Sequence, residues 1–571
     1  MTHDLIVRGG TVVDGSGLPG IRADVAITND KITEIGALNG ELAKKEIDAA
    51  GLIVSPGFID GHTHMDAQLF WDEIGSNSCW HGVTSVVMGN CGFTLAPCAE
   101  AHKDLVLNNL ERAEDISPEA MNAGIEWSWE TFSEYFDVVD EIPKGLNYAS
   151  FVGHSALRTY AMGDRAMEEE ATHQDMALME RELENSLRAG ALGLSTSRTN
   201  SHRTPEGKPV ASRLAGWNEV TRLARVMKKL GNGIFQLARE NTISDDFERR
   251  KEFEGIKELA LDIGVRVTFG NTWYRPSHPD IWRQQVGLVD EIVAAGGGVM
   301  MQGTASWNCS LRSFETKTPY DYVPEWREFR SKTLYEQKQY LNNPEIRERL
   351  VEAVENHQHK PDPSMPNLFQ RPVDWDWVFP LDRPLPPFHS VADIAQARGL
   401  KPIEAFIDLA LEHDLKLFFI QPSFNQDQEA VLEMIQHPNA VVTFSDAGAH
   451  VATTVNPIHG QLLGHWVRNT RAIPLESAIR KITHDIANFW GLPQRGLIRE
   501  GYFADLTIFD PDEISPGMPT LHHDLPSGAP RIKQKTDGIK ATIVNGQHFM
   551  QENEHTGALA GKLIRGPLAK I

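Results

Sequence analysis

The chain has 571 residues, which suits about three to four ordinary domains or one large barrel with smaller satellite domains. Hydrophobic residues make up 41% and charged residues 23%, which excludes a disordered or fibrous protein. The formal net charge of −23 argues against nucleic acid or an anionic membrane as a partner. No apolar run reaches the length of a membrane span, and the first residues lack a secretory pattern. Four cysteines in a chain of this length indicate a reducing compartment, so we expect a cytoplasmic protein.

Both ends of the chain predict short strands with alternating polar and apolar residues. We expect residues 1–55 and residues 491–571 to form one small β-sandwich, which makes residues 56–490 an inserted domain. Two separate β flaps are the alternative. The predicted terminal strands lie in residues 4–36, 501–510 and 538–547.

Eight short apolar runs recur through the middle of the chain, and helical stretches lie between several of them. This rhythm predicts an α/β fold, a (β/α)8 TIM barrel, with its chemistry at the carboxyl ends of the strands. The run at residues 416–422 competes for one of the eight places. The eight runs are residues 52–60, 82–90, 147–154, 190–197, 232–239, 264–271, 297–303 and 440–447.

Residues 304–390 interrupt the rhythm, and their second part is rich in proline and aromatic residues. So long an irregular excursion is usually functional or disordered, and Trp375, Trp377 and Phe379 argue against disorder. We interpret this insertion as a lid over the barrel mouth or as a contact in a homo-oligomer.

The segment Gly61-His62-Thr63-His64 directly follows a buried run, VSPGFID. Residues i and i+2 at a strand end point to the same side, so His62 and His64 are directed at one point, as a divalent metal ion requires. A pair of polar loop histidines is the alternative.

Two later strand ends supply further candidate ligands. Cys91 ends the second run, where a thiolate would lie beside the histidine pair; a buried structural thiol is an equally good interpretation. Asp446 ends the last run, where a carboxylate can bind the metal and accept a proton; a helix-capping or turn aspartate is its alternative. His450, four residues later, is a possible neighbour of the site, and Cys79, Cys98 and Cys309 are expected to be structural.

These motifs resemble the amidohydrolase superfamily, and within it the N-acyl-D-amino-acid deacylase branch. The resemblance covers nearly the whole chain apart from residues 304–390. It is carried by Asp14 and by the segments SPGFIDGHTHMD, GNCG (89–92), VGHSALR (152–158), GALGLSTS, SDAGAH and RGLIREGYFADLTIFDPDEI.

The resemblance implies a (β/α)8 barrel with a β-sandwich from both termini, zinc at the strand ends, and hydrolysis of an acyl amide. His62 and His64 match the ligands of the first strand, and Cys91 matches the cysteine that replaces a bridging carboxylated lysine in this branch. Asp446 matches the ligand and base of the last strand.

The chain departs from the family pattern at the fifth and sixth strands. There the family has histidines that hold a second, tight metal, whereas this chain has Gln236-Leu237-Ala238-Arg239 and Gly270-Asn271-Thr272-Trp273. Leucine and alanine cannot bind zinc, so we expect one zinc ion on His62, His64 and Asp446, with or without Cys91. The family's carboxylate-binding lysine is also missing, and Asn271 and His278 are candidate substitutes.

The predicted reaction is hydrolysis by metal-activated water, with Asp446 moving the proton from water to the leaving nitrogen. His154 is the candidate donor to the developing oxyanion, with a structural histidine as the alternative. Three arginines, Arg158, Arg198 and above all Arg239, are candidates to bind a substrate carboxylate. Tyr160, His202 and Trp273 are candidate pocket residues.

Other functions remain open at this point. The same fold could hydrolyse a cyclic amide, a lactone or ester, or a larger acylated compound. A metal-dependent lyase or isomerase and a non-catalytic binding protein are further alternatives. In each enzymatic case the partner is a small molecule.

Overall fold

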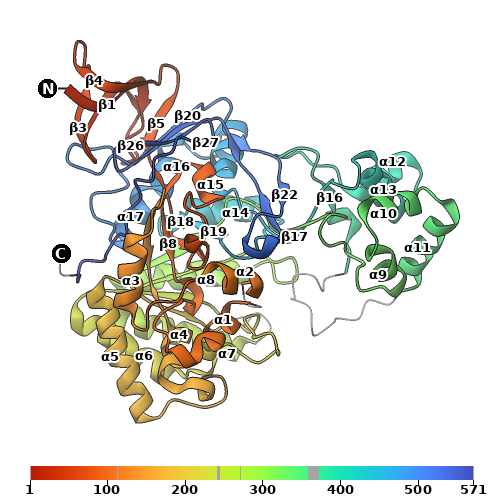
Figure 1. Ribbon diagram of the computed structural model, residues 1–571, viewed down its shortest axis with the longest axis horizontal. Helices are drawn as coiled ribbons and strands as arrows, with labels where there is room; N and C mark the ends of the chain where they lie inside the picture. The colour runs from red at the N-terminus through yellow and green to blue at the C-terminus, as the bar shows by residue number, and fades with distance from the viewer. Residues whose placement is uncertain (1, 112–113, 241–244, 271, 358–371, 570–571) are drawn as a thin grey trace.

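The computed structural model describes residues 2–111, 114–240, 245–270, 272–357 and 372–569. It contains a parallel barrel, a β layer from both termini and a separate group of helices (Figure 1). The predicted fold class is confirmed: an α/β barrel with a second domain of strands.

All eight predicted runs form barrel strands, in the expected order around the barrel. Their residues are almost entirely buried, as is usual where helices cover a parallel sheet. The first and last strands complete the ring through a short parallel pairing in which Phe444 faces His62 and Ala447 faces Thr63. The strands are β6 (Phe58–Asp60) with β7 (His62–Thr63), β8 (Val83–Met88), β9 (Asn147–Ser150) with β10 (Val152–Gly153), β11 (Gly193–Ser197), β12 (Ile234–Ala238), β13 (Arg266–Phe269), β14 (Val299–Gly303), and β18 (Ala440–Val442) with β19 (Phe444–Ala447).

Amphipathic helices surround the strands and end where the sequence provides the usual signals. For example, α6 (Trp217–Leu230) ends at Gly231, whose φ of 71° is left-handed. The threonine cap of α5 (His173–Ala189) is a complete capping box with Asp175. The other helices around the barrel include α3 (Phe132–Glu141), α4 (His154–Met162), α7 (Asp246–Lys257), α8 (Ile281–Ala294), α14 (Gln428–Gln436), α16 (Leu475–Ile482) and α17 (His484–Trp490).

The terminal layer is one nine-stranded sheet built from both ends of the chain. Its centre is the pairing of β5 with β1 on one side and with β20 on the other. Figure 1 shows the N-terminal strands at the upper left with β20 and β26 beside them. The strands are β1 (Thr2–Val12), β2 (Ile21–Thr28), β3 (Lys31–Gly36), β4 (Leu42–Asp48), β5 (Ile53–Pro56), β20 (Leu506–Phe509), β25 (Ile539–Val544), β26 (Gln547–Gln551) and β27 (Glu554–His555).

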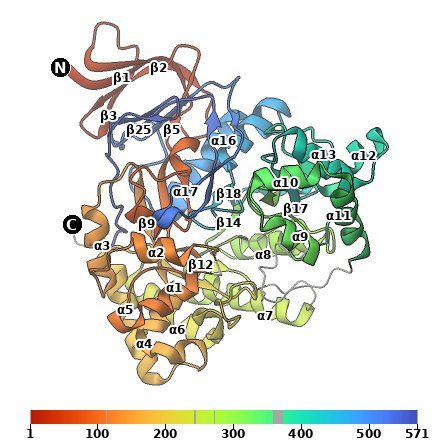
Figure 2. The ribbon, with the colours of Figure 1, turned by 45° about the vertical axis from the view of Figure 1, so that its right-hand side comes forward.

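The insertion between the seventh and eighth barrel strands combines long irregular stretches, as expected for residues 304–390, with several short helices. Its helices share a hydrophobic core of their own and stand to the side of the barrel (Figures 1 and 2). Run 416–422 contributes to this insertion through β17, not to the barrel. The elements are β15 (Asn308–Arg312), α9 (Pro324–Arg330), α10 (Leu334–Leu341), α11 (Pro344–Asn356), β16 (Phe379–Pro380), α12 (Val391–Arg398), α13 (Pro402–Glu412) and β17 (Phe419–Phe424).

The aromatic residues that argued for order in this segment are packed. Trp375 lies against Tyr320 and Phe406 in the helical core, and Trp377 lies against Trp307. The proline-rich residues 361–371 lie outside the described part of the chain. No helix in the described part of the chain combines the length and the apolar character needed to cross a membrane.

Candidate metal centre

The carboxyl ends of the first and last barrel strands bring His62, His64 and Asp446 together. The Asp446 Oδ1 atom lies 3.4 Å from His62 Nε2 and 3.3 Å from His64 Nε2. Ligands of one tetrahedral zinc ion are separated by about 3.3 Å, since each lies about 2 Å from the metal. The three side chains therefore have the spacing of atoms that share one cation.

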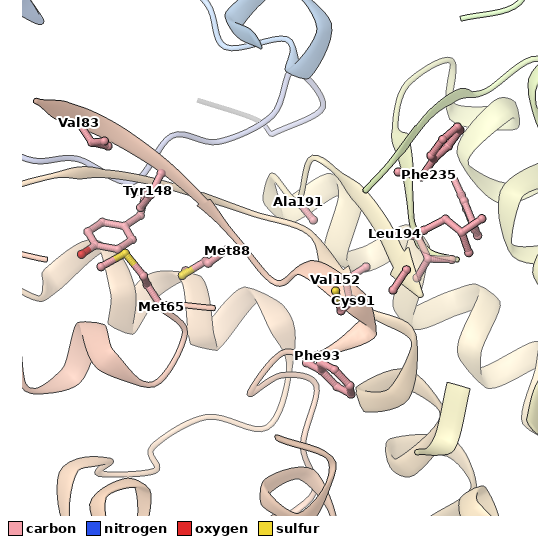
Figure 3. Close-up of a cluster of buried hydrophobic side chains, with 14 of the residues drawn as sticks. Met65, Val83, Met88, Cys91, Phe93, Tyr148, Val152, Ala191, Leu194 and Phe235 are labelled. Carbon is pink, nitrogen blue, oxygen red and sulfur yellow. The ribbon is translucent and has the colours of Figure 1, made fainter. Parts of the chain in front are cut away.

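Cys91 reaches the same point from the end of β8. Its Sγ atom lies 3.4 Å from His62 Nε2. Cys91 has a left-handed backbone with φ of 57°, and two side chains hold this loop: Gln236 Oε1 accepts the Cys91 N–H at 2.8 Å, and Ser195 Oγ accepts the Gly92 N–H at 2.9 Å. Figure 3 shows Cys91 next to Val152, among the side chains of the buried apolar cluster.

Gln302, at the end of β14, orients the first histidine. The His62 Nδ1 atom lies 2.6 Å from Gln302 Oε1, and Gln302 Nε2 donates to Thr268 Oγ1 at 3.1 Å. Because an amide oxygen only accepts, the Nδ1 atom carries the proton, and the Nε2 lone pair faces Asp446 and Cys91. No sequence motif marks Gln302, although its place at a barrel strand end is a signal that could have revealed it.

Burial and neighbouring charges set the protonation state of each of these side chains, and His64 and Cys91 must each lose a proton to bind a cation. Burial lowers the pKa of His62 to about 4, so this imidazole is neutral and able to ligate at pH 7. Burial opposes protonation of His64 as well, but the carboxylates of Glu114 and Asp446 outweigh it and raise the pKa of His64 well above its usual range. Burial raises the pKa of the Cys91 thiol to about 12, so ligation by Cys91 requires loss of a proton.

Glu114 is a second carboxylate at the centre, and the sequence analysis did not identify it. It lies in the turn between α1 (Lys103–Glu111) and α2 (Pro118–Gly124), and its Oε2 atom is 3.5 Å from His64 Nε2. No local motif marks this residue, because the turn lies outside the barrel strands and approaches the metal centre only in the folded chain.

The donor set fits a divalent metal ion. Two groups of three potential ligands converge here and share one histidine: His62, His64 and Cys91, and His64, Glu114 and Asp446. Both ring nitrogens of His64 are buried, and neither has a hydrogen-bond partner. A buried polar group without a partner is costly, and a cation at this point would provide one.

His154, the candidate oxyanion donor, occupies a structural position instead. Its Nε2 atom lies 2.8 Å from Glu219 Oε1, and its Nδ1 atom lies 2.9 Å from Thr196 Oγ1. Arg158 is fully buried and pairs with the same Glu219 carboxylate. These partners occupy both ring nitrogens of His154 and the Nη1 atom of Arg158. The expected roles of His154 as oxyanion donor and of Arg158 as carboxylate ligand are therefore replaced by structural roles.

The other two candidate arginines differ in their free donors. Arg198 is paired with Glu240 and packs on Trp217. Arg239 is buried and pairs with Glu252 through Nη2, but its Nε and Nη1 atoms have no hydrogen-bond partner. Arg239 therefore keeps two donors available for a ligand, whereas Arg158 keeps only its Nε.

Arg275, which the sequence analysis did not single out, adds a second available guanidinium. It follows β13, its guanidinium carbon lies 4.1 Å from the centre of the Phe424 ring and 5.9 Å from that of the Trp273 ring, and no ion pair joins it to another described residue. Burial, together with the neighbouring charge of Arg239, lowers the pKa of Arg275 to about 10. Two partly desolvated positive charges near one another favour binding of an anion.

The remaining candidates are distributed around the centre. His202 lies 3.9 Å from Glu114 Oε1, and Trp273 stacks on Phe424 beside Phe444, which packs on His62. Tyr160 hydrogen-bonds to Glu130, and His278 contacts Ser277, so neither lies among the described contacts of the centre. Asn271 lies outside the described residues.

Two adjoining cavities border the segment that carries Asp446. The first is lined by Asp446 together with Asp60 and Arg531. The second is mainly apolar and lies against Trp307 and Phe388 of the insertion. Val455 and Asn456 line both, so the space beside Asp446 continues toward the insertion.

Comparisons with known proteins agree with this arrangement. Residues 45–549 match the amidohydrolase family. D-aminoacylase of Alcaligenes xylosoxydans xylosoxydans is 28% identical over 571 residues, which cover 98% of this chain and 97% of that protein. N-acyl-D-glutamate deacylase of the same organism is 27% identical and covers 95% of this chain and 93% of its own length.

Solved structures share the fold over the full length. The crystal structure of D-aminoacylase has a TM-score of 0.65 at 23% identity and covers 99% of this chain and 100% of its own. N-acyl-D-glutamate deacylase from Bordetella bronchiseptica, solved with zinc and a phosphonate mimic of the tetrahedral intermediate, has a TM-score of 0.64 at 22% identity, with the same coverage. Another D-aminoacylase structure, with a TM-score of 0.66 at 23% identity and the same coverage, is described as having a binuclear metal centre that one metal activates and a second attenuates.

Proposed function

Because the chain belongs to the amidohydrolase family, we propose that it is a metal-dependent hydrolase that cleaves the amide bond of an N-acyl amino acid, with the D-enantiomer as substrate. The observation that carries this proposal is the convergence of His62, His64, Cys91 and Asp446 at separations of 3.3 to 3.4 Å. Imidazole and thiolate donors favour zinc as the cation.

A bound zinc ion would activate a water molecule and polarise the scissile carbonyl. The chain's own residues then manage the proton. Asp446 turns Oδ1 toward the two imidazoles, which leaves Oδ2 to take a proton from the attacking water and to return it to the leaving nitrogen. The two imidazoles and the short pairing of β7 with β19 hold Asp446 in place for this transfer.

Arg239 and Arg275 are proposed to bind the carboxylate of the substrate. Arg239 offers Nε and Nη1, and Arg275 offers its whole guanidinium group. A planar guanidinium donates two parallel hydrogen bonds to a carboxylate, which fixes the orientation of the substrate as well as its charge. This pair takes over the task for which the family pattern provides a lysine.

The proposal is tested with the full-length protein, freed of metal and reloaded with zinc. N-acyl-D-amino acids should be hydrolysed, their L-enantiomers much more slowly, and label from H₂¹⁸O should enter the released acid. The Asp446→Asn variant should lose about 10²- to 10⁴-fold in kcat, as expected for removal of a general base. Full activity of that variant would refute the assigned base.

The substrate panel must also include other classes, because the fifth and sixth strands differ from the family pattern. Cyclic imides and lactones are the alternatives that the same centre can hydrolyse. Turnover of these compounds without turnover of any N-acyl amino acid would refute the deacylase proposal while leaving the hydrolase intact. A His62→Ala, His64→Ala double variant that retains a full metal complement would refute the ligand assignment.

A further inference from the structure

We propose that Glu114 is a further ligand of the metal ion, so that this chain completes its metal centre with a carboxylate from a turn outside the barrel. This inference rests on the metal centre of the proposed function, but it does not depend on the identity of the substrate. It concerns a residue on the turn between α1 and α2, which follows the loop that carries Cys91.

The first observation is a buried carboxylate with an unpartnered oxygen. The Glu114 side chain is only 3% exposed, and its Oε1 atom has no hydrogen-bond partner. Its ion-pair neighbours among the described residues are three imidazoles, at 3.5 Å (His64) and 3.9 Å (His202 and His450), beyond normal hydrogen-bond length. Burying a carboxylate without a donor is expensive, so this position requires a partner.

The second observation is the spacing of the neighbouring atoms. Glu114 Oε2 lies 3.5 Å from His64 Nε2, which itself lies 3.3 Å from Asp446 Oδ1. These separations are too long for good hydrogen bonds and match the distance between two ligands of one cation. The three side chains form one of the two groups of convergent donors, and the other group contains Cys91 and shares His64.

The third observation is that the turn is fixed in place. The backbone N–H of His450 donates to the Glu114 carbonyl at 2.7 Å, and Thr453 Oγ1 donates to Asp115 at 3.4 Å. Glu114 N–H donates to Leu110 at the end of α1. The turn is thereby attached to the same segment that presents Asp446, so both carboxylates reach the centre from one joined unit.

The proposal also accounts for the altered fifth and sixth strands. Gln236 on β12 uses its side-chain oxygen to hold the Cys91 backbone, and Gly270 after β13 has no side chain. The barrel therefore offers no imidazole at these places, and Glu114 supplies a negatively charged oxygen from another direction. The resulting donor set is two imidazoles, one thiolate and two carboxylates.

The experiment measures metal binding to the full-length protein without substrate. Metal-free wild type and Glu114→Gln are titrated with Zn²⁺ in competition with a chromophoric chelator, and Glu119→Gln, an exposed glutamate on the same segment, is the matched control. Glu114→Gln should bind Zn²⁺ at least 10-fold more weakly, while Glu119→Gln should equal wild type. Wild-type affinity in Glu114→Gln would overturn the proposal.

A second variant separates ligation from a simple effect of charge. Glu114→Asp keeps the negative charge but withdraws the oxygen by one methylene, so a ligand role predicts weaker binding and a changed Co²⁺ absorption spectrum. Wild-type affinity and an unchanged spectrum in this variant would show that only the charge matters and would overturn ligation. If Glu114→Gln does not fold, Glu114→Asp alone decides the question.

Thermal unfolding provides the remaining comparison. A ligand stabilises the folded state according to its affinity, so added Zn²⁺ should raise the Tm of wild type more than that of Glu114→Gln. A purely structural role predicts the opposite pattern: a lower Tm of the metal-free variant and an equal shift with Zn²⁺. Loss of deacylase activity on every substrate tested, with normal metal binding in the wild type, would refute the proposed function and leave this inference standing.

Discussion

Replacing Gln302 with leucine removes the hydrogen-bond acceptor that fixes the tautomer of His62. The His62 Nδ1 atom lies 2.6 Å from Gln302 Oε1, and the imidazole is 1% exposed, so water cannot replace the lost partner. Either Nδ1–H stays buried without an acceptor, or the proton moves to Nε2 and blocks the lone pair that faces Asp446. The first outcome costs about 1 to 3 kcal/mol.

This cost appears directly in metal binding. Loss of a hydrogen bond to a metal-bound histidine typically weakens binding by about 10- to 100-fold, which corresponds to about 1.4 to 2.7 kcal/mol. We therefore expect the Kd for Zn²⁺ of Gln302→Leu to rise by this factor in a chelator-competition titration. Circular dichroism of the metal-free protein confirms that the variant is folded.

The matched control is Gln302→Glu, which keeps an oxygen acceptor at the same distance. Its carboxylate can accept from Thr268 Oγ1 once that hydroxyl turns away from the Met300 carbonyl, to which it donates at 3.0 Å. Zinc affinity of this variant should equal or exceed that of wild type. A folded Gln302→Leu protein with unchanged Kd would refute the argument that this hydrogen bond sets the tautomer.

Three further predictions concern other parts of the site. Arg275→Met should raise KM for a carboxylate substrate at least 10-fold with little change in kcat, and should leave KM for the matching carboxamide unchanged. Equal effects on both substrates would show that Arg275 does not bind the substrate carboxylate. Zinc binding at pH 7.5 should release at least one proton in wild type and fewer in Cys91→Ala, because the pKa of the free thiol is about 12. Calorimetry in buffers of different ionisation enthalpy measures the number of protons released. Equal release in the two proteins would show that Cys91 is not a metal ligand. Burial opposes ionisation of Glu219, but His154 and Arg158 lower its pKa from 4.5 to about 2. The ionised carboxylate therefore contributes about 3 kcal/mol to the free energy of unfolding above pH 4.5, and this contribution is lost as the pH falls toward 2. Urea unfolding between pH 2 and 6 should show this loss in wild type but not in Glu219→Gln, and parallel curves would refute it.

The barrel could be predicted because its strands are short apolar runs with a regular spacing. The run at residues 440–447 was correctly placed last, although more than 130 residues separate it from the run at 297–303. The convergence of His62, His64 and Asp446 could be predicted for the same reason: each lies at a strand end, where the fold decides the direction of the side chain. The resemblance to a known family supported the same residues.

The residues that the sequence did not reveal lie where local pattern carries no information. Glu114 is in a turn between two helices, and only the docking of that turn on residues 446–453 brings it to His64. Arg275 looks like any polar loop residue, and its importance depends on having no ion-pair partner among the described residues of the folded chain. His154 ends a strand, as a catalytic residue would, but its neighbours Thr196 and Glu219 come from other elements and occupy both ring nitrogens.

The pairing of β7 with β19 has a consequence for how the barrel holds together. In the described part of the chain two pairs of facing residues join the first strand to the last, and the His64 N–H adds a hydrogen bond to the Ala447 carbonyl at 2.7 Å. The polypeptide between these strands is almost the whole barrel. The same two strands present His62 and Asp446, so a cation bound by both residues would cross-link the first and last strands of the barrel. Chelation of the metal should therefore speed hydrogen exchange and proteolysis first at β7 and β19. Strands β11 to β13, which are continuously paired, should stay protected.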